Sequence, residues 1–240
     1  MTGSGARGGQ QRIPRPSVAS RLESPWAVLT PDARVLRVAD VRERLRDLPP
    51  PRTAELPPYF VAGSTEPVNS ADPVAARDAA VLLPLFDEAG EARLVLTRRP
   101  QHLPTHQGEI ALPGGKVDVA LDADAAAAAL REAREEIALA PESVTIIAEL
   151  DHVPSVGGPF VIAPFVGIVD ARPHLVAAPG EVDRVFDVAL SELLDPEVHH
   201  VEQWGERTMH FFELEDETVW GATARILAGF LGLVTGVAGG

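Results

Sequence analysis

Three glutamates lie close together at the end of an alanine-rich segment: Glu132, Glu135 and Glu136. Residues 124–138 are mostly Ala, Leu, Arg and Glu, which favour a helix. Positions i, i+3 and i+4 of a helix share one face, so the three carboxylates converge. Like charges at that spacing repel by roughly 0.2–0.5 kcal/mol per pair, and a hard divalent cation with oxygen ligands relieves this repulsion. We therefore predict that these glutamates bind Mg²⁺ or Mn²⁺ and that Glu135 and Glu136 act in catalysis.

The alternative for the three glutamates is a solvated acidic face, partly neutralised by Arg131 and Arg134. A glycine pair upstream favours a site. Gly114 and Gly115 lie in a tight turn and let the backbone pass close to the carboxylates without a side-chain clash.

Cationic residues near this turn are suited to hold phosphate oxygens. Lys116 is the only lysine in a chain whose other cationic side chains are arginines, and it would place a compact charge next to the glycines. We predict that five residues bind the substrate: Arg98, Arg99, Gly114, Gly115 and Lys116. Glu181 is a candidate for an additional ligand or general base, and a plain capping or surface glutamate is the open alternative.

The elements that must position these residues follow from apolar patterning. Short apolar runs predict a hairpin over residues 79–97, in which Pro84 would mark a bulge or an edge strand. Further strands are expected at residues 144–150, 160–169 and 210–214, with helices at 190–194 and 221–234. This order predicts an α/β fold, with one mixed sheet sandwiched between helices in an α/β/α arrangement.

The N-terminus differs in composition from the remainder. Residues 1–33 are rich in Gly, Ser, Arg and Pro and are predicted to form a flexible tail, because they offer little apolar surface to bury. Residues 34–240 are predicted to form a single domain with an accessory helix at about 36–48.

Composition restricts the classes of function. The 240 residues contain no cysteine, which fits a reducing cytoplasm and excludes disulfides and thiolate sites. A formal net charge of −14 argues against a nucleic-acid partner. We also expect no membrane association and no signal peptide, because apolar runs of the required length are missing. A cytoplasmic enzyme acting on small molecules is the resulting expectation.

The glycine turn, together with the run from Arg131 to Glu136, resembles the Nudix box of the Nudix hydrolases. Upstream and downstream residues resemble the coenzyme A pyrophosphatase branch of that family: Leu96-Thr97-Arg98-Arg99, Gly108, Ile110, Leu112-Pro113-Gly114-Gly115, Glu181-Val182 and Trp220-Gly221-Ala222-Thr223. The resemblance implies a Nudix-like α/β/α sandwich, a divalent metal and a coenzyme A-like pyrophosphate substrate. The implied products are 3′,5′-ADP and 4′-phosphopantetheine, or its acylated form.

The sequence departs from this branch at several positions. Ala138 replaces the glycine expected after the glutamates and predicts a less sharp helix end. Pro104 replaces a basic residue, Pro100 a small one and Leu112 a phenylalanine.

Two alternatives therefore stay open. One is a Nudix hydrolase of another nucleoside diphosphate derivative, such as ADP-ribose, a dinucleotide or a nucleotide sugar. The other is a non-catalytic Nudix-like binding module, against which the intact glutamates argue. The acyl preference, the physiological metal, a homodimeric state and a ligand role for Asp118, Asp122 or Asp124 also stay open.

Overall fold

A computed structural model describes residues 7–9, 11, 13–53, 77–103, 106–155 and 159–238. Its main sheet has eight strands in the order β4-β3-β2-β8-β6, with β5 paired to β2, β7 to β8 and β9 to β3. β2 and β8 are parallel and the other pairs are antiparallel, so the sheet is mixed. The strands are β2 (Arg77–Glu88), β3 (Glu91–Arg98), β4 (Ile110–Ala111), β5 (Gly114–Lys116), β6 (Val144–Glu149), β7 (Val153–Pro154), β8 (Phe160–Val169) and β9 (Arg184–Ala189).

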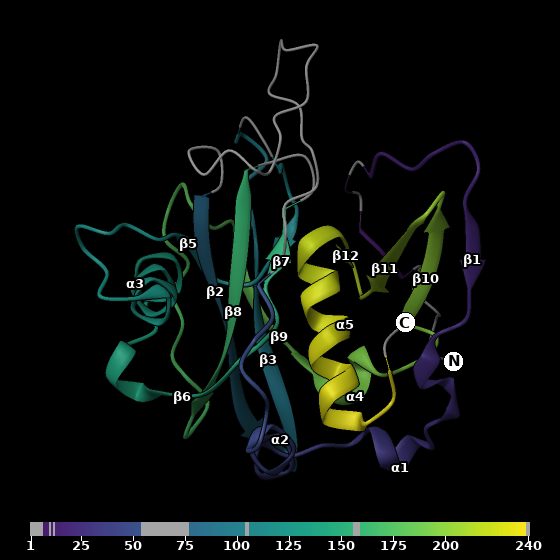
Figure 1. Cartoon of the computed structure of the whole chain (residues 1–240), viewed down its shortest axis with the longest axis horizontal. Helices are drawn as coiled ribbons and strands as arrows, with labels where there is room; N and C mark the ends of the chain where they lie inside the picture. Colours follow the sequence, from purple (N-terminus) through teal and green to yellow (C-terminus); the bar gives the residue numbers. More distant parts are fainter. Residues whose placement is uncertain are drawn as a thin grey trace.

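Helices cover both faces of this sheet (Figure 1). Alternate side chains of a strand point to opposite faces, and β2 shows this pattern. Leu82 belongs to the buried cluster beneath α3 (Ala125–Ile137), whereas Leu83 belongs to the cluster shared with α2 (Val38–Leu45) and α5 (Gly221–Thr235). The short helices are α4 (Leu190–Leu193) and a 3-10 turn, η2 (Pro141–Ser143). The predicted α/β/α layering is confirmed.

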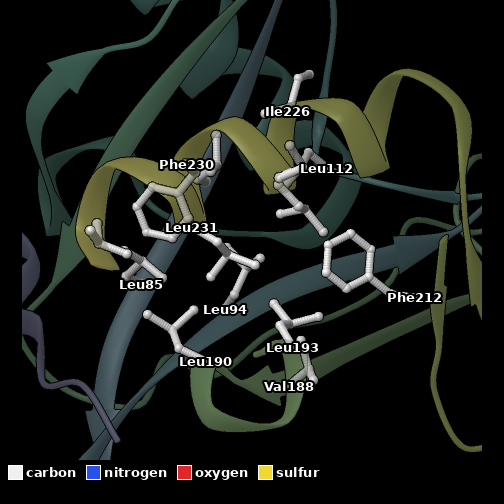
Figure 2. Packing of buried hydrophobic residues seen from close by; sticks show 14 of the residues in the cluster. Leu85, Leu94, Leu112, Val188, Leu190, Leu193, Phe212, Ile226, Phe230 and Leu231 are labelled. Atoms are coloured by element: carbon white, nitrogen blue, oxygen red, sulfur yellow. The ribbon is translucent and has the colours of Figure 1, made fainter. Parts of the chain in front are cut away.

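A second, four-stranded antiparallel sheet lies beyond α5 (Figure 1). Its order is β1-β10-β11-β12, formed by Ser20–Leu22, His199–Trp204, Arg207–Glu213 and Thr218–Val219. Figure 2 shows how it joins the core: Phe212 of β11 lies in the same apolar cluster as Leu94 of the main sheet and Leu231 of α5. Of these strands only the segment at residues 210–214 was predicted.

The predicted flexible tail over residues 1–33, and with it the domain boundary at residue 34, needs correction. Residues 20–22 form β1 and pair with β10, and the chain then continues into η1 (Pro25–Val28) and α1 (Pro31–Arg34). Trp26 is completely buried in the main core cluster. The composition of the segment is polar on average, but one large aromatic ring and a hydrogen-bonded strand are enough to dock it. Residues 1–6, 10 and 12 lie outside the described residues.

Pro84 occupies an interior strand, contrary to the predicted edge or bulge. On one side β2 pairs with β8 through Pro84 and its neighbours. On the other side β2 pairs with β5 at residues 79–81 and with β3 only from Leu85 onward. Leu82 donates its N–H to the carbonyl of Pro113. The nitrogen of Pro84, two residues later, points to the same side of β2, into the gap between β5 and β3. No strand of the described chain accepts a hydrogen bond there, so the missing N–H of proline costs nothing.

None of the helices in the described part of the chain is long and apolar enough to cross a membrane.

Candidate active site

The helix that carries the glutamates is fixed at its start by aspartates. Asp124 is the N-cap of α3, and its Oδ1 accepts the N–H of Ala127 at 2.8 Å. Asp122 binds the guanidinium of Arg131 through both carboxylate oxygens, at 2.8 and 2.9 Å. Asp118 accepts the N–H of Ala120 in the loop before the helix. These contacts give all three aspartates structural roles at the start of the helix.

The glycine turn brings the main chain against both the sheet and the helix. β5 pairs with β2, so that Gly114 lies opposite Val81 and Gly115 opposite Ala80. A Cβ on Gly114 would lie 2.3 Å from the carbonyl oxygen of Ala80, and one on Gly115 would lie 2.5 Å from the carboxylate carbon of Glu132. At Gly114 the close atoms are backbone, so only glycine fits there. At Gly115 the close atoms belong to Glu132, so its carboxylate is seated directly against this glycine.

Glu136 connects the helix to this turn. Its Oε2 accepts the N–H of Gly114 at 3.0 Å. Burial raises the pKa of Glu136 to about 7, and the nearby carboxylates of Glu132 and Glu181 act in the same direction. The Gly114 hydrogen bond and the charge of Arg99 lower that pKa but are outweighed. Glu181 and Arg99, distant from Glu136 in sequence, thus lie within electrostatic reach of it.

Glu135 is more exposed than the other two glutamates, with 53% of its side chain accessible. Arg131 bridges it to Glu132, because one guanidinium nitrogen donates to both carboxylates at 2.9 and 3.1 Å. Arg131 also donates to the carbonyl oxygen of Lys116. It therefore neutralises the acidic face, as the alternative interpretation suggested for it, and also ties α3 to the glycine turn.

The donor set fits a hard divalent cation. Within the described ranges no group of three His, Asp or Glu side chains lies close enough together to hold a metal ion, and Arg131 binds two of the three glutamates. A buried carboxylate with a raised pKa beside two more carboxylates is nevertheless the kind of charge concentration that such a cation stabilises. Glu132, Glu135 and Glu136 are the residues that would hold it.

The three predicted cations have different surroundings. Arg98 is engaged in ion pairs, with Asp183 at 2.8 Å and with Glu217 at 2.9 Å. Arg99 has a buried Nε that finds no hydrogen-bond partner among the described residues. The ammonium of Lys116 lies 5.7 Å from the ring centre of Phe160, at the start of β8. Arg98 is thus held by protein carboxylates, whereas the described part of the chain shows no such ion pair for Arg99 or Lys116.

Two residues of this region were not identified from the sequence: Asp183 and Glu217, the partners of Arg98. No spacing rule connects them to Arg98, because they lie 85 and 119 positions away in the chain. The only sequence signal was the proximity of Asp183 to Glu181.

α3 ends sharply, contrary to the expectation for Ala138. Ala138 adopts the left-handed conformation, with φ 57° and ψ 26°, and its N–H donates to the carbonyl oxygens of Ala133 and Arg134. The same turn forms as with glycine, although the side chain makes it less favourable.

A family model described as the NUDIX domain matches residues 76–228. The uncharacterized Nudix hydrolase NudL of Enterobacter sp. is 41% identical over 171 residues, covering 67% of this chain and 84% of the relative. The NudL protein of Citrobacter koseri is 43% identical over 155 residues, which cover 63% of this chain and 79% of that relative.

Solved structures of Nudix proteins match parts of this chain. The Nudix hydrolase RenU from M. smegmatis is 25% identical, with a TM-score of 0.41 over 47% of this chain and 70% of that chain. A MutT/nudix family protein from Enterococcus faecalis is 17% identical, with a TM-score of 0.45, and the match covers 72% of this chain and 62% of that chain.

Proposed function

The chain belongs to the Nudix family of hydrolases, and from this premise we propose that it is a metal-dependent pyrophosphohydrolase that cleaves coenzyme A or acyl-coenzyme A. The products would be 3′,5′-ADP and 4′-phosphopantetheine, with the acyl group retained on the latter. The observation that carries the hydrolase assignment is the contact of Glu132 and Glu136 with the glycine turn, next to Glu181 and Arg99.

Each residue of the site has a task in such a hydrolysis. A divalent cation bound by the glutamates would supply charge screening at the pyrophosphate and activation of water. Glu136 is held in place by Gly114, and Glu181 lies near enough to it to act as a further ligand or as the general base. Arg99 and Lys116 would hold phosphate oxygens and orient the pyrophosphate for in-line attack.

The coenzyme A assignment is supported by the signature residues of that branch around Arg99 and the glycine turn. Coenzyme A carries a 3′-phosphate that ADP-ribose and nucleotide sugars lack. The guanidinium of Arg99, for whose Nε no partner is found among the described residues, and the exposed ammonium of Lys116 are suited to recognise this extra dianion in an otherwise acidic protein.

A second candidate is hydrolysis of another nucleoside diphosphate derivative, such as ADP-ribose. Two observations favour it. Pro104 stands where the coenzyme A branch has a basic residue, and Arg98 is already paired with two carboxylates. Both reduce the number of cations available for a 3′-phosphate.

Steady-state kinetics on coenzyme A, 3′-dephospho-coenzyme A and ADP-ribose, with Mg²⁺ or Mn²⁺, tests the proposal. A charge-assisted contact contributes roughly 1.5–3 kcal/mol, so coenzyme A should exceed its dephospho form in kcat/KM by about ten- to a hundredfold. Arg99→Ala or Lys116→Ala should remove that preference. Glu136→Gln should lower kcat by at least about a hundredfold with the fold retained.

Arg172→Ala is the matched control, since Arg172 pairs with Glu88 and Asp187 at the opposite end of the β2–β3 hairpin. Its kinetics should equal those of the wild type. Equal rates on the first two substrates, or faster hydrolysis of ADP-ribose, would transfer the assignment to the second candidate. Full activity of Glu136→Gln would contradict the metal site itself.

A further inference from the structure

Glu217 is a buried carboxylate that collects donors from three separate parts of the chain. It is 2% exposed. Its oxygens accept from Arg98 of β3 at 2.9 Å, from Arg184 of β9 at 3.3 Å and from Gln11 of the N-terminal segment at 3.0 Å. A charge withdrawn from water is costly unless it is paired and hydrogen-bonded. This convergence of donors satisfies that requirement and fixes all three segments to one point.

Arg98 extends the connection toward the active site. Its guanidinium holds Glu217 on one side and Asp183 on the other, the latter through Nε at 3.0 Å and Nη2 at 2.8 Å. Its carbonyl oxygen accepts the N–H of Asp183 at 2.8 Å. Both the side chain and the main chain of Asp183 are therefore attached to Arg98, immediately before β9 begins.

Asp183 lies two residues after Glu181, whose charge raises the pKa of Glu136. The turn that carries Glu181 is attached on its other side to the catalytic helix, because Ala178 donates its N–H to the carbonyl of Glu136 at 2.8 Å. The chain from Ala178 to Asp183 is thus held at both ends. One anchor is α3, and the other is Arg98.

From these contacts we propose that Glu217 is a positioning residue for the hydrolysis. It orients Arg98, Arg98 orients Asp183, and the tethered segment sets the carboxylate of Glu181 relative to Glu136. The inference rests on the proposed function only in that Glu181 serves the hydrolysis. It places part of the control of the site on Glu217, directly before β12, and on the N-terminal segment, outside the signature residues.

The test is Glu217→Gln, which keeps the shape of the side chain and removes its charge. The change should lower kcat by about tenfold with KM within about twofold, because small displacements of a catalytic group cost rate rather than binding. Hydrogen exchange at residues 181–184 should accelerate in the same variant, since the bond from Asp183 N–H to Arg98 is loosened.

Glu213→Gln is the matched control. Glu213 is another partly buried carboxylate of the second sheet, hydrogen-bonded to Thr218 and paired with Arg15. No contact with Arg98 is found for it in the part of the chain that the structure describes. The kcat of the Glu213→Gln variant and its hydrogen exchange at residues 181–184 should match those of the wild type, even if the melting temperature of the variant falls.

Arg98→Gln, alone and combined with Glu217→Gln, decides whether Glu217 acts through Arg98. The double variant should lose no more kcat than Arg98→Gln alone. Additive losses, or unchanged kcat and exchange in a folded Glu217→Gln, would overturn the proposal. If Glu217→Gln does not fold, the same kinetic and exchange changes are expected of Arg98→Gln, and their absence overturns it. If the wild-type protein hydrolyses no pyrophosphate, the proposed function fails, while the exchange comparison still decides the positioning role.

Discussion

Two histidines of the second sheet are buried next to each other. His199 and His210 lie on neighbouring strands, with Nε2 of the first 3.2 Å from Nδ1 of the second. Nδ1 of His199 lies 2.9 Å from the hydroxyl of Ser24, and its ring packs against Trp26 and Phe212. Burial lowers the pKa of His199 to about 3 and that of His210 to about 4, with the charge of Arg225 adding to the effect on His210. Both rings are therefore neutral at pH 7.

These pKa values predict a loss of stability in mild acid. In the unfolded chain both histidines take up a proton near pH 6.5, whereas the folded protein resists it down to about pH 4. The unfolded state then binds more protons, so stability falls as the pH drops below about 6.5, by up to about 1.4 kcal/mol per pH unit for each histidine. Melting temperatures at pH 7.5, 6.5 and 5.5 should therefore decline less steeply for His210→Gln than for the wild type. Parallel curves would contradict the assignment of neutral, buried histidines.

For single residues, the sequence predicted which side chains lie near the glycine turn better than it predicted the ion-pair partners of Arg98. Helical spacing and glycine chemistry are local rules, and they identified Glu132, Glu136, Gly114 and Gly115, which the structure brings together. The pairing of Arg98 depends on carboxylates far away in the chain, about which spacing carries no information.

Among the elements, α3 has an unusual end. Ala138 adopts a left-handed conformation that costs an L-residue roughly 1–2 kcal/mol and glycine almost nothing. The strain lies directly after Glu136 and Ile137, so the turn is kept by the packing of the helix on the sheet.

Ala138→Gly should accordingly stabilise the protein by about 1 kcal/mol and raise the melting temperature by roughly 2–4 °C. Ala127→Gly, in the first turn of the same helix, is the control and should destabilise by up to about 1 kcal/mol, because glycine has a lower helix propensity than alanine. Thermal unfolding of both variants beside the wild type provides the measurement. An unchanged or lower melting temperature for Ala138→Gly would show that the αL turn carries no strain.

Apolar periodicity predicted the helices α2 to α5 and the main-sheet strands β2, β3, β6 and β8. It predicted neither the strands β4, β5, β7 and β9 nor the pairing of the strands. The parallel alignment of β2 with β8 joins segments about 80 residues apart, and β1 pairs with β10. β1 has three exposed residues and no apolar alternation, so its position depends on main-chain hydrogen bonds that any sequence can make. Pro84 was misassigned for the same reason, since the gap that accommodates it is created by β3 and β5.

For the molecule as a whole, the N-terminal segment is part of the folded unit. Trp26 lies in the core between the two sheets, with its ring centre 4.3 Å from that of His199. Closer to the N-terminus, Gly8 donates its N–H to the carbonyl of Leu214, and Arg15 forms ion pairs with Glu202 and Glu213.

Trp26→Ala is expected to destabilise the protein by about 3–5 kcal/mol, through lost apolar burial and the cavity left behind. The melting temperature should fall by roughly 2–4 °C for each kcal/mol. Val28→Ala, two residues on at a largely exposed position, should change stability by less than about 0.5 kcal/mol. Denaturant unfolding of both variants tests the expectation, and similar stabilities would mean that the segment is dispensable.

The long-range strand pairs also have a consequence for the order in which the protein assembles during synthesis. β2, β5 and α3 all lie within residues 77–137, so the glycine turn and the three glutamates can associate once residue 137 has left the ribosome. Glu181 follows only after β8 has docked, and its anchor at Glu217 emerges later still. Ser20–Leu22, although made first, must wait for β10, about 180 residues downstream, before its backbone is paired. A chain stalled before residue 181 would therefore carry the three glutamates of α3 without Glu181.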